Sequence, residues 1–253
     1  MTSTTTTPAP GTSAKDHPDA DEHQQWGRSR RGLCPRTAHA EWQLTDARDA
    51  VAILANQEQH RLPFLVPVRH ARMLASPFAF YRGSAAVMAT DLATTATTGL
   101  NAQICGDAHL SNFGLFGSPE RSLVFDCNDF DETHPGPWEW DVKRLAVSAV
   151  LMASDRGWDE SVQRRLARSV GLGYRLSMAD LASKGRLDVW YSRLTDEQIL
   201  ALANADSRAL VERQFRKARL NDVTKAITKY TEVLDGRRRF VHQPPLVMRL
   251  DDS

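Results

Sequence analysis

The segment from Asp107 to Asp141 constrains the fold most, because two short apolar runs stand inside an otherwise polar stretch. The runs Phe113–Gly117 and Ser122–Asp126 are joined by a turn at Ser118-Pro119, a pattern typical of a β-hairpin. After Asp141, apolar side chains recur at helical spacing: Val142, Leu145, Ala146, Ala149, Val150 and Ala153. The sequence therefore predicts a small hairpin, with a polar loop before it and an acidic loop after it, followed by a long helix.

Most of the remaining chain has helical patterns. They cover residues 46–59, 84–92, 162–170, 195–202, 210–215 and 223–234. Pro63 and Pro67 predict an extended stretch over 62–68. We expect one helix to end near Gly171 and another to stop at Asp235-Gly236. The predicted fold class is α+β, mainly helical with a small β-hairpin.

The first 25 residues contain no Val, Ile, Leu, Phe, Trp or Tyr. Such a segment cannot bury enough apolar surface to offset the entropy of ordering it. We therefore predict a disordered tail over 1–25 and one domain over 26–253.

The overall composition excludes several classes of partner. Of the 253 residues 42% are apolar, and 32 basic residues against 31 acidic ones leave a formal charge of +1. This balance gives no general basic field for nucleic acid, so we do not expect a nucleic-acid partner. No apolar run is long enough to span a bilayer and no secretory leader is visible, so we expect no membrane contact and a cytoplasmic location. The oligomeric state cannot be predicted.

Charge is concentrated locally. The segment 107–141 has eight carboxylates and one base, Arg121, a balance of −7, which predicts a bound cation. Asp107 and Asn112 form the D-x-x-x-x-N order that kinases use, in which the Asp takes the proton of the acceptor hydroxyl and the Asn binds Mg²⁺. A second Asp on Mg²⁺ completes that arrangement.

Two residues compete for the second metal position. Asp126 follows Asn112 by 14 residues and ends an apolar strand, whereas Asp129 follows it by 17. We favour Asp126 and keep Asp129 as the alternative. His109 is a second candidate catalytic residue, which either faces the acceptor or fixes the loop through backbone hydrogen bonds. Arg82 either contacts phosphate or pairs with the acidic loop.

Several motifs resemble known families. The run Gly106–Asn112 resembles the G-D-x-H-x-x-N catalytic loop of aminoglycoside phosphotransferases, although Cys105 stands where that loop usually has His. The run Asp141–Ala146 is similar to their D-L-A helix start. Four longer runs resemble the bacterial domain-of-unknown-function family 2252, with similarity from about Trp42 to the C-terminus: 76–83, 105–114, 125–132 and 135–141.

These resemblances imply a protein-kinase-like catalytic lobe that transfers phosphate from Mg²⁺-ATP to a hydroxyl-bearing small molecule. Asp107 and His109 would be catalytic, Arg82 would bind the nucleotide, and the metal ligands would be Asn112 with Asp126 or Asp129. No Gly-rich nucleotide clamp precedes Asp107, and the family pattern implies further segments after Ser253, so we expect the domain to be incomplete at its C-terminus. The sequence leaves open whether this chain is active without those segments.

Two other functions fit the same residues. Asp, His and Asn side chains also suit Mn²⁺ or Zn²⁺ in a metal-dependent hydrolase. A catalytically inert module that keeps the fold to bind a partner is the third possibility.

Overall fold

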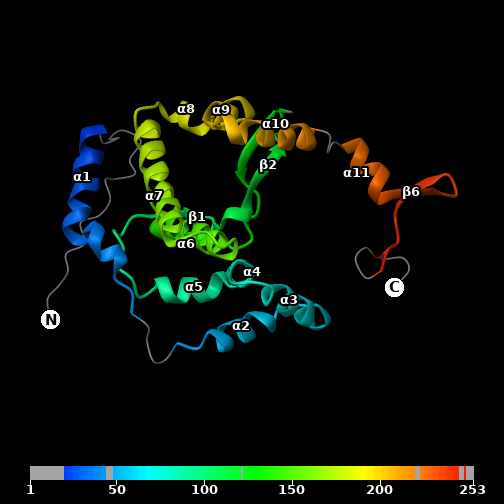
Figure 1. Ribbon diagram of the computed structural model, residues 1–253, viewed down its shortest axis with the longest axis horizontal. Coiled ribbons are helices and arrows are strands. Elements are labelled where there is room, and N and C mark those ends of the chain that lie inside the picture. Colours follow the sequence, from blue (N-terminus) through cyan, green and yellow to red (C-terminus); the bar gives the residue numbers. More distant parts are fainter. Residues whose placement is uncertain (1–19, 44–47, 121, 220–222, 245–247, 249–253) are drawn as a thin grey trace, which may run out of the picture. The chain divides into compact units, whose positions relative to one another are not determined.

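The computed structural model describes residues 20–43, 48–120, 122–219, 223–244 and 248 (Figure 1). The chain divides into two compact units. Unit 1 comprises residues 1–112 and 129–191, and unit 2 comprises residues 113–128 and 192–253. Of the predicted tail, residues 20–25 form the start of a helix, and residues 1–19 lie outside the described residues.

Unit 1 is mainly helical. Its helices are α1 (Ala20–Leu33), α2 (Ala50–Glu58), α3 (Val66–Met73), α4 (Pro77–Arg82), α5 (Ala85–Leu92), α6 (Glu139–Asp155), α7 (Glu160–Ala182) and α8 (Arg186–Trp190). Short 3-10 turns are η1 (Arg36–Ala40), η2 (Pro63–Leu65) and η3 (Leu110–Asn112). Strands β1 (Asn101–Ile104) and β4 (His134–Pro137) pair antiparallel, with Asn101 opposite Pro137.

Residues 63–68 are helical and only Leu62 has an extended backbone, so the prediction of an extended arm over 62–68 is wrong. Pro63 and Pro67 stand in the first turns of η2 and α3. A proline there loses no hydrogen bond, because the first N–H groups of a helix have no partner within it. The Ser76 side chain caps α4 by accepting a hydrogen bond from the backbone N–H of Ala79.

Helices α6 and α7 pack against each other in unit 1. α7 continues through Gly171 and Gly173 to Ala182, so the predicted end near Gly171 is wrong. A glycine inside a helix costs only about 1 kcal/mol relative to alanine, which a helix packed along a neighbour tolerates. The buried side of α6 includes two small residues, Ala149 and Ala153, which allow close packing.

Unit 2 contains the predicted hairpin. Strands β2 (Phe113–Gly117) and β3 (Leu123–Cys127) pair antiparallel, and β5 (Leu194–Thr195) adds a third strand beside β3. The helices of this unit are α9 (Asp196–Leu202), α10 (Ala205–Arg219) and α11 (Val223–Tyr230). The capping box predicted before α9 is present, with Thr195 and Gln198 bonded to each other's backbone N–H groups.

The last predicted helix ends early. Residues Thr231–Leu234 form β6, which pairs with β7 (Arg237–Phe240). Asp235 and Gly236 both have positive φ, 51° and 72°, as a two-residue turn between paired strands requires. The mixture of helices and small sheets agrees with the predicted α+β class. No helix among the described residues combines the length and apolar character needed to cross a membrane.

Candidate functional site

The candidate site is the loop that follows β1 in unit 1 and includes η3. It begins with Cys105 and Gly106 and ends at Asn112. Gly106 has a φ of +80°, and a Cβ at this position would collide with the backbone carbonyl of Glu132. Only glycine fits this close approach, so the chain enters the loop along a fixed path.

Two side chains of α6 hold the backbone of this loop. Asp141 accepts hydrogen bonds from the backbone N–H groups of Cys105, at 2.7 Å, and Gly106, at 3.0 Å. Ser148, two helical turns further on, accepts from the N–H of Leu110 at 3.0 Å. The carboxylate of Asp141 is charged, and hydrogen bonds to a charged acceptor are stronger than those between neutral groups.

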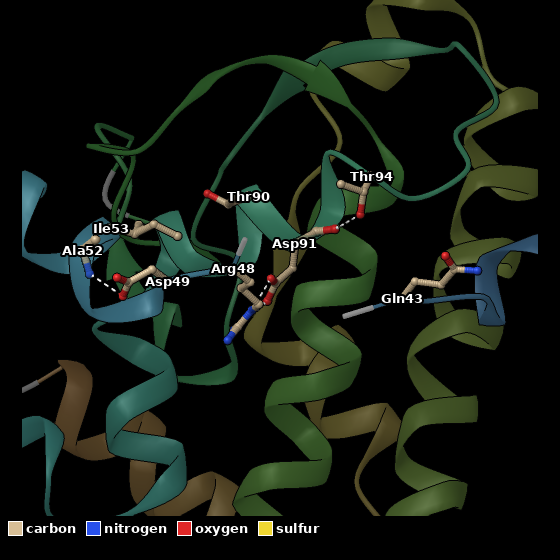
Figure 2. Close-up of a pocket in the computed structure, with 8 residues that line it drawn as sticks. All are labelled: Gln43, Arg48, Asp49, Ala52, Ile53, Thr90, Asp91 and Thr94. Atoms are coloured by element: carbon tan, nitrogen blue, oxygen red, sulfur yellow. Dashed lines mark hydrogen bonds and ion pairs between the residues drawn. The ribbon is translucent and has the colours of Figure 1, made fainter. Parts of the chain in front are cut away.

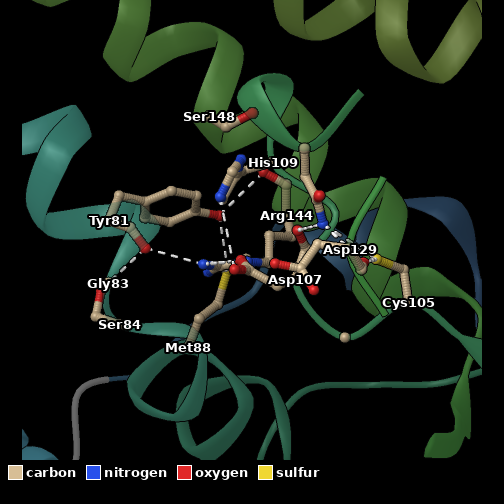
Figure 3. A network of polar contacts seen from close by, with 12 residues as sticks. Tyr81, Gly83, Ser84, Met88, Cys105, Asp107, His109, Asp129, Arg144 and Ser148 are labelled. Carbon is tan, nitrogen blue, oxygen red and sulfur yellow. Dashed lines mark hydrogen bonds and ion pairs between the residues drawn. The ribbon is translucent and has the colours of Figure 1, made fainter. Parts of the chain in front are cut away.

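The centre of the site is an ion pair between Asp107 and Arg144 (Figure 3). Arg144 Nε and Nη2 lie 2.6 and 2.5 Å from Asp107 Oδ1, and the Arg144 side chain is only 2% exposed. Nη2 also donates to the backbone carbonyl of Tyr81 at 2.9 Å. The guanidinium stacks 4.4 Å above the Tyr81 ring, and the Tyr81 hydroxyl donates to the carbonyl of Arg144. Arg144 thus links α4, α6 and the loop.

The carboxyl group of Asp107 keeps partial access to solvent, with 19% of its side chain exposed. Burial raises its pKa above the ordinary value, and this effect exceeds the lowering by Arg144. The charges of Asp131 and Asp129 raise it further. One oxygen, Oδ1, is engaged by Arg144, which leaves Oδ2 as the oxygen with remaining capacity to accept a proton.

His109 is buried beside Asp107. Its Nε2 lies 3.5 Å from Asp107 Oδ2, and its ring meets Phe78 edge-on. Burial, followed by the positive charges of Arg144 and Arg82, lowers its pKa to about 4. The imidazole is therefore neutral at pH 7. Its Nδ1 is buried with no hydrogen-bond partner in the described part of the chain.

Asn112 is also buried, and its amide is held in one orientation. Its Nδ2 donates to the backbone carbonyls of Asp107, at 3.1 Å, and Asp129, at 3.0 Å. Two carbonyl acceptors identify this atom as the nitrogen. Asn112 Oδ1 is consequently the atom of the amide that can face a cation.

The structure brings together four predicted site residues, Asp107, His109, Asn112 and Asp129, in unit 1. Asp126 belongs to unit 2, on β3, where it accepts a hydrogen bond from the N–H of Cys127. The backbone carbonyl of Asp129 accepts a hydrogen bond from Asn112 in the loop. This contact favours Asp129 as the second metal ligand, whereas spacing in the sequence favoured Asp126.

Arg82 ends α4 and its side chain is exposed. It lies near enough to His109 for its charge to lower the pKa of that imidazole. Arg82 makes no ion pair within the described residues, so the predicted pairing with the acidic loop is not seen there.

Sequence reasoning missed the roles of Arg144 and Asp141. They stand three residues apart at the start of α6, and this spacing puts them on one face of a helix. The sequence did contain a signal for these roles, because an acidic and a basic residue stand on one helix face shortly after the acidic loop.

The described residues contain no group of three or more His, Cys, Asp or Glu side chains arranged to hold a metal ion. A catalytic zinc site needs three protein ligands of this kind. Magnesium is less demanding, because it is commonly held by one or two protein oxygens together with substrate phosphates and water. The amide oxygen of Asn112 and the nearby Asp129 fit the second case.

These features define a mixed helical and β protein with an aspartate-centred loop anchored by one long helix. Residues 61–253 match the family described as "Uncharacterized protein conserved in bacteria (DUF2252)". The chain belongs to this family. The match begins at residue 61, later than the Trp42 expected from the motifs. Searches of curated proteins and of solved structures found no match.

The lowered pKa of His109 predicts a pH-dependent stability. In the unfolded chain His109 takes up a proton near pH 6.5, whereas the folded protein resists protonation down to about pH 4. Stability is therefore lost as pH falls below 6.5, by about 1.4 kcal/mol per pH unit, or about 2 kcal/mol at pH 5. Urea unfolding at pH 7 and pH 5 measures the loss.

The variant His109→Gln should remove this part of the pH dependence. His60→Gln, at an exposed histidine, is the matched control and should behave as the wild type. Equal pH dependence in wild type and His109→Gln would show that His109 is solvated in the folded state.

Proposed function

We propose that the protein is a kinase-like phosphotransferase that transfers the γ-phosphoryl group of ATP to a hydroxyl group of a small molecule. The observation that carries this proposal is the loop 107–112, where the Asn112 amide is bonded to the carbonyl of Asp107 while the Asp107 carboxyl group stays partly exposed. An aspartate and an asparagine five residues apart are the pair that kinase chemistry requires.

Asp107 would act as the general base. The acceptor oxygen forms its bond to the γ-phosphorus, the bond to the leaving ADP oxygen breaks, and the hydroxyl proton passes to Asp107 Oδ2. Its raised pKa suits this task, because a base works best when its pKa is near the working pH. Arg144 holds the carboxyl group through Oδ1 and so fixes the direction of Oδ2.

His109 has a positioning role in this proposal. It is 6% exposed and neutral, so it shapes the wall beside Asp107 and does not carry a proton to or from solvent. Its backbone N–H donates to the carbonyl of Asp107, and its carbonyl accepts from the N–H of Asn112, which favours the second of the two roles that the sequence left open.

Asn112 Oδ1 and the Asp129 carboxylate would hold Mg²⁺, which supplies charge neutralisation for the phosphates when it is bound. Asp126 stays the alternative for the second position. Arg82, an exposed cation close to the loop, would contact a phosphate oxygen.

The hydrolase alternative receives less support, because the described residues lack a grouped set of metal ligands. An inert binding module is the outcome expected if nucleotide chemistry fails.

The test is phosphoryl transfer from Mg²⁺-ATP to a pool of sugars, polyols and amino sugars, followed by ³¹P NMR. We expect ADP and a phosphate ester as products, and the formation of both should require Mg²⁺.

Asp129→Asn should raise the Mg²⁺ concentration needed for half-maximal rate at least about tenfold, while Asp126→Asn leaves it unchanged. The reverse order would return the metal position to Asp126. No ester with any acceptor, together with no binding of Mg²⁺-ATP, would contradict the proposal.

A further inference from the structure

Unit 1 contains a cavity that none of the loop residues Asp107, His109 and Asn112 lines. Its volume is about 740 Å³, and it lies among α4, α5, α6 and the segment 39–42. Small-molecule sites have volumes of about 300–1,000 Å³. The cavity is therefore large enough for a ligand of its own.

The walls of this cavity are mainly apolar. Phe80, Val87, Leu92, Val147 and Leu151 contribute side chains from the three helices. Tyr81 also lines the cavity, and its hydroxyl already donates to the carbonyl of Arg144. An occupant would thus meet hydrocarbon over most of its surface.

Two charged groups at the cavity wall neutralise each other. Arg48 and Asp91 form an ion pair through two hydrogen bonds of 2.6 and 3.0 Å. Figure 2 shows this pair from a neighbouring pocket of about 410 Å³, which Arg48 and Asp91 also line. The pair lines both cavities and offers little net charge to either.

Lys143 is different. Its Nζ donates to Thr95 Oγ1 at 3.1 Å, and no carboxylate in the described part of the chain pairs with it. Glu139 stands one turn before Lys143 on α6, and its charge acts on the ammonium group without forming an ion pair with it. Its Oε1 accepts both the N–H and the hydroxyl of Thr98, while its Oε2 has no hydrogen-bond partner in the described part of the chain. Glu41 also lines the cavity, but its side chain is exposed. Lys143 therefore presents an ammonium group with unused N–H donors at the edge of an apolar space.

We propose that this cavity binds a single-chain amphiphile with an anionic head, the tail among the apolar walls and the carboxylate on Lys143. The site is separate from the proposed phosphotransfer site, so either proposal can fail without the other.

A series of saturated carboxylates tests the tail. Titration calorimetry of the 253-residue protein with hexanoate, octanoate and decanoate, each below its micelle concentration, should give one site. Affinity should rise about fourfold for each added methylene group. Trp42 lines the cavity, so binding should also change a fluorescence signal that Trp42→Phe removes.

Decanol and decylamine test the head. Both carry the same tail, and decanoate should bind about tenfold more tightly than decanol, with decylamine weakest. Lys143→Met should reduce decanoate to the level of decanol and leave decanol unchanged, whereas Lys143→Arg should keep the preference for the anion. Lys184→Met is the matched control, because Lys184 pairs with Asp180 outside the cavity.

Three results would overturn the proposal. They are an affinity that does not depend on chain length, a Lys143→Met variant that binds decanoate as the wild type does, and an equal loss in Lys184→Met. If Lys143→Met does not fold, the affinities of decanoate, decanol and decylamine for the wild type and for Lys143→Arg still decide whether the site prefers an anionic head.

Discussion

Replacing Arg144 with methionine is expected to lower the free energy of unfolding by about 3–5 kcal/mol, the range for breaking a buried ion pair on one side. Methionine keeps much of the length of the side chain but removes every donor. The Asp107 carboxylate would lose its cation, and the carbonyl of Tyr81 would lose a hydrogen bond. Urea unfolding at pH 7 measures the change.

An exposed arginine gives the control for this experiment. Arg164 pairs with Glu160 on α7, and their side chains are 69% and 74% exposed. Arg164→Met should therefore change the free energy of unfolding by less than about 0.5 kcal/mol. A loss below about 1 kcal/mol in Arg144→Met would mean that water replaces the guanidinium, and that the loop does not depend on α6 through this contact.

Some elements were predictable because their signals are local. The β2–β3 hairpin follows from two short apolar runs around Ser118-Pro119, and α9 follows from a capping box within four residues. In both cases neighbouring residues satisfy each other's hydrogen bonds. Such elements need little information from the rest of the chain.

The prediction failed where one local sequence signal fits two structures. Asp235-Gly236 can end a helix or form the turn of a hairpin, and only the pairing of β6 with β7 decides between them. Pro63 and Pro67 likewise fit an extended strand or the first turn of a helix. In each case tertiary packing decides which of the two structures forms, and the local sequence pattern carries no information about that packing.

The candidate site shows the same division. Asp107, His109 and Asn112 are within six residues, so their proximity could be predicted. Arg144 lies on α6, 37 residues after Asp107 in the sequence, and only the folded chain shows that the two form an ion pair. The choice between Asp126 and Asp129 could not be made from spacing, because the chain passes from unit 2 back to unit 1 between them.

Asp107→Asn has the largest expected effect on activity. Under the proposed function, the amide cannot take the proton of the acceptor hydroxyl, so kcat for phosphoryl transfer should fall about 10²- to 10⁴-fold. Binding of Mg²⁺-ATP should change little, because Asp107 acts on the acceptor. The rate of ADP release at saturating Mg²⁺-ATP, together with a nucleotide titration, separates the two effects.

Stability must be measured on the same Asp107→Asn variant, since Asp107 also neutralises Arg144. The new amide oxygen can still accept from the guanidinium, so this change should cost less than Arg144→Met, about 1–3 kcal/mol. Asp131→Asn is the matched control, because Asp131 acts on Asp107 only through its charge. A folded Asp107→Asn protein that keeps its rate would exclude the base role, and the pair with Arg144 would then have a purely structural purpose.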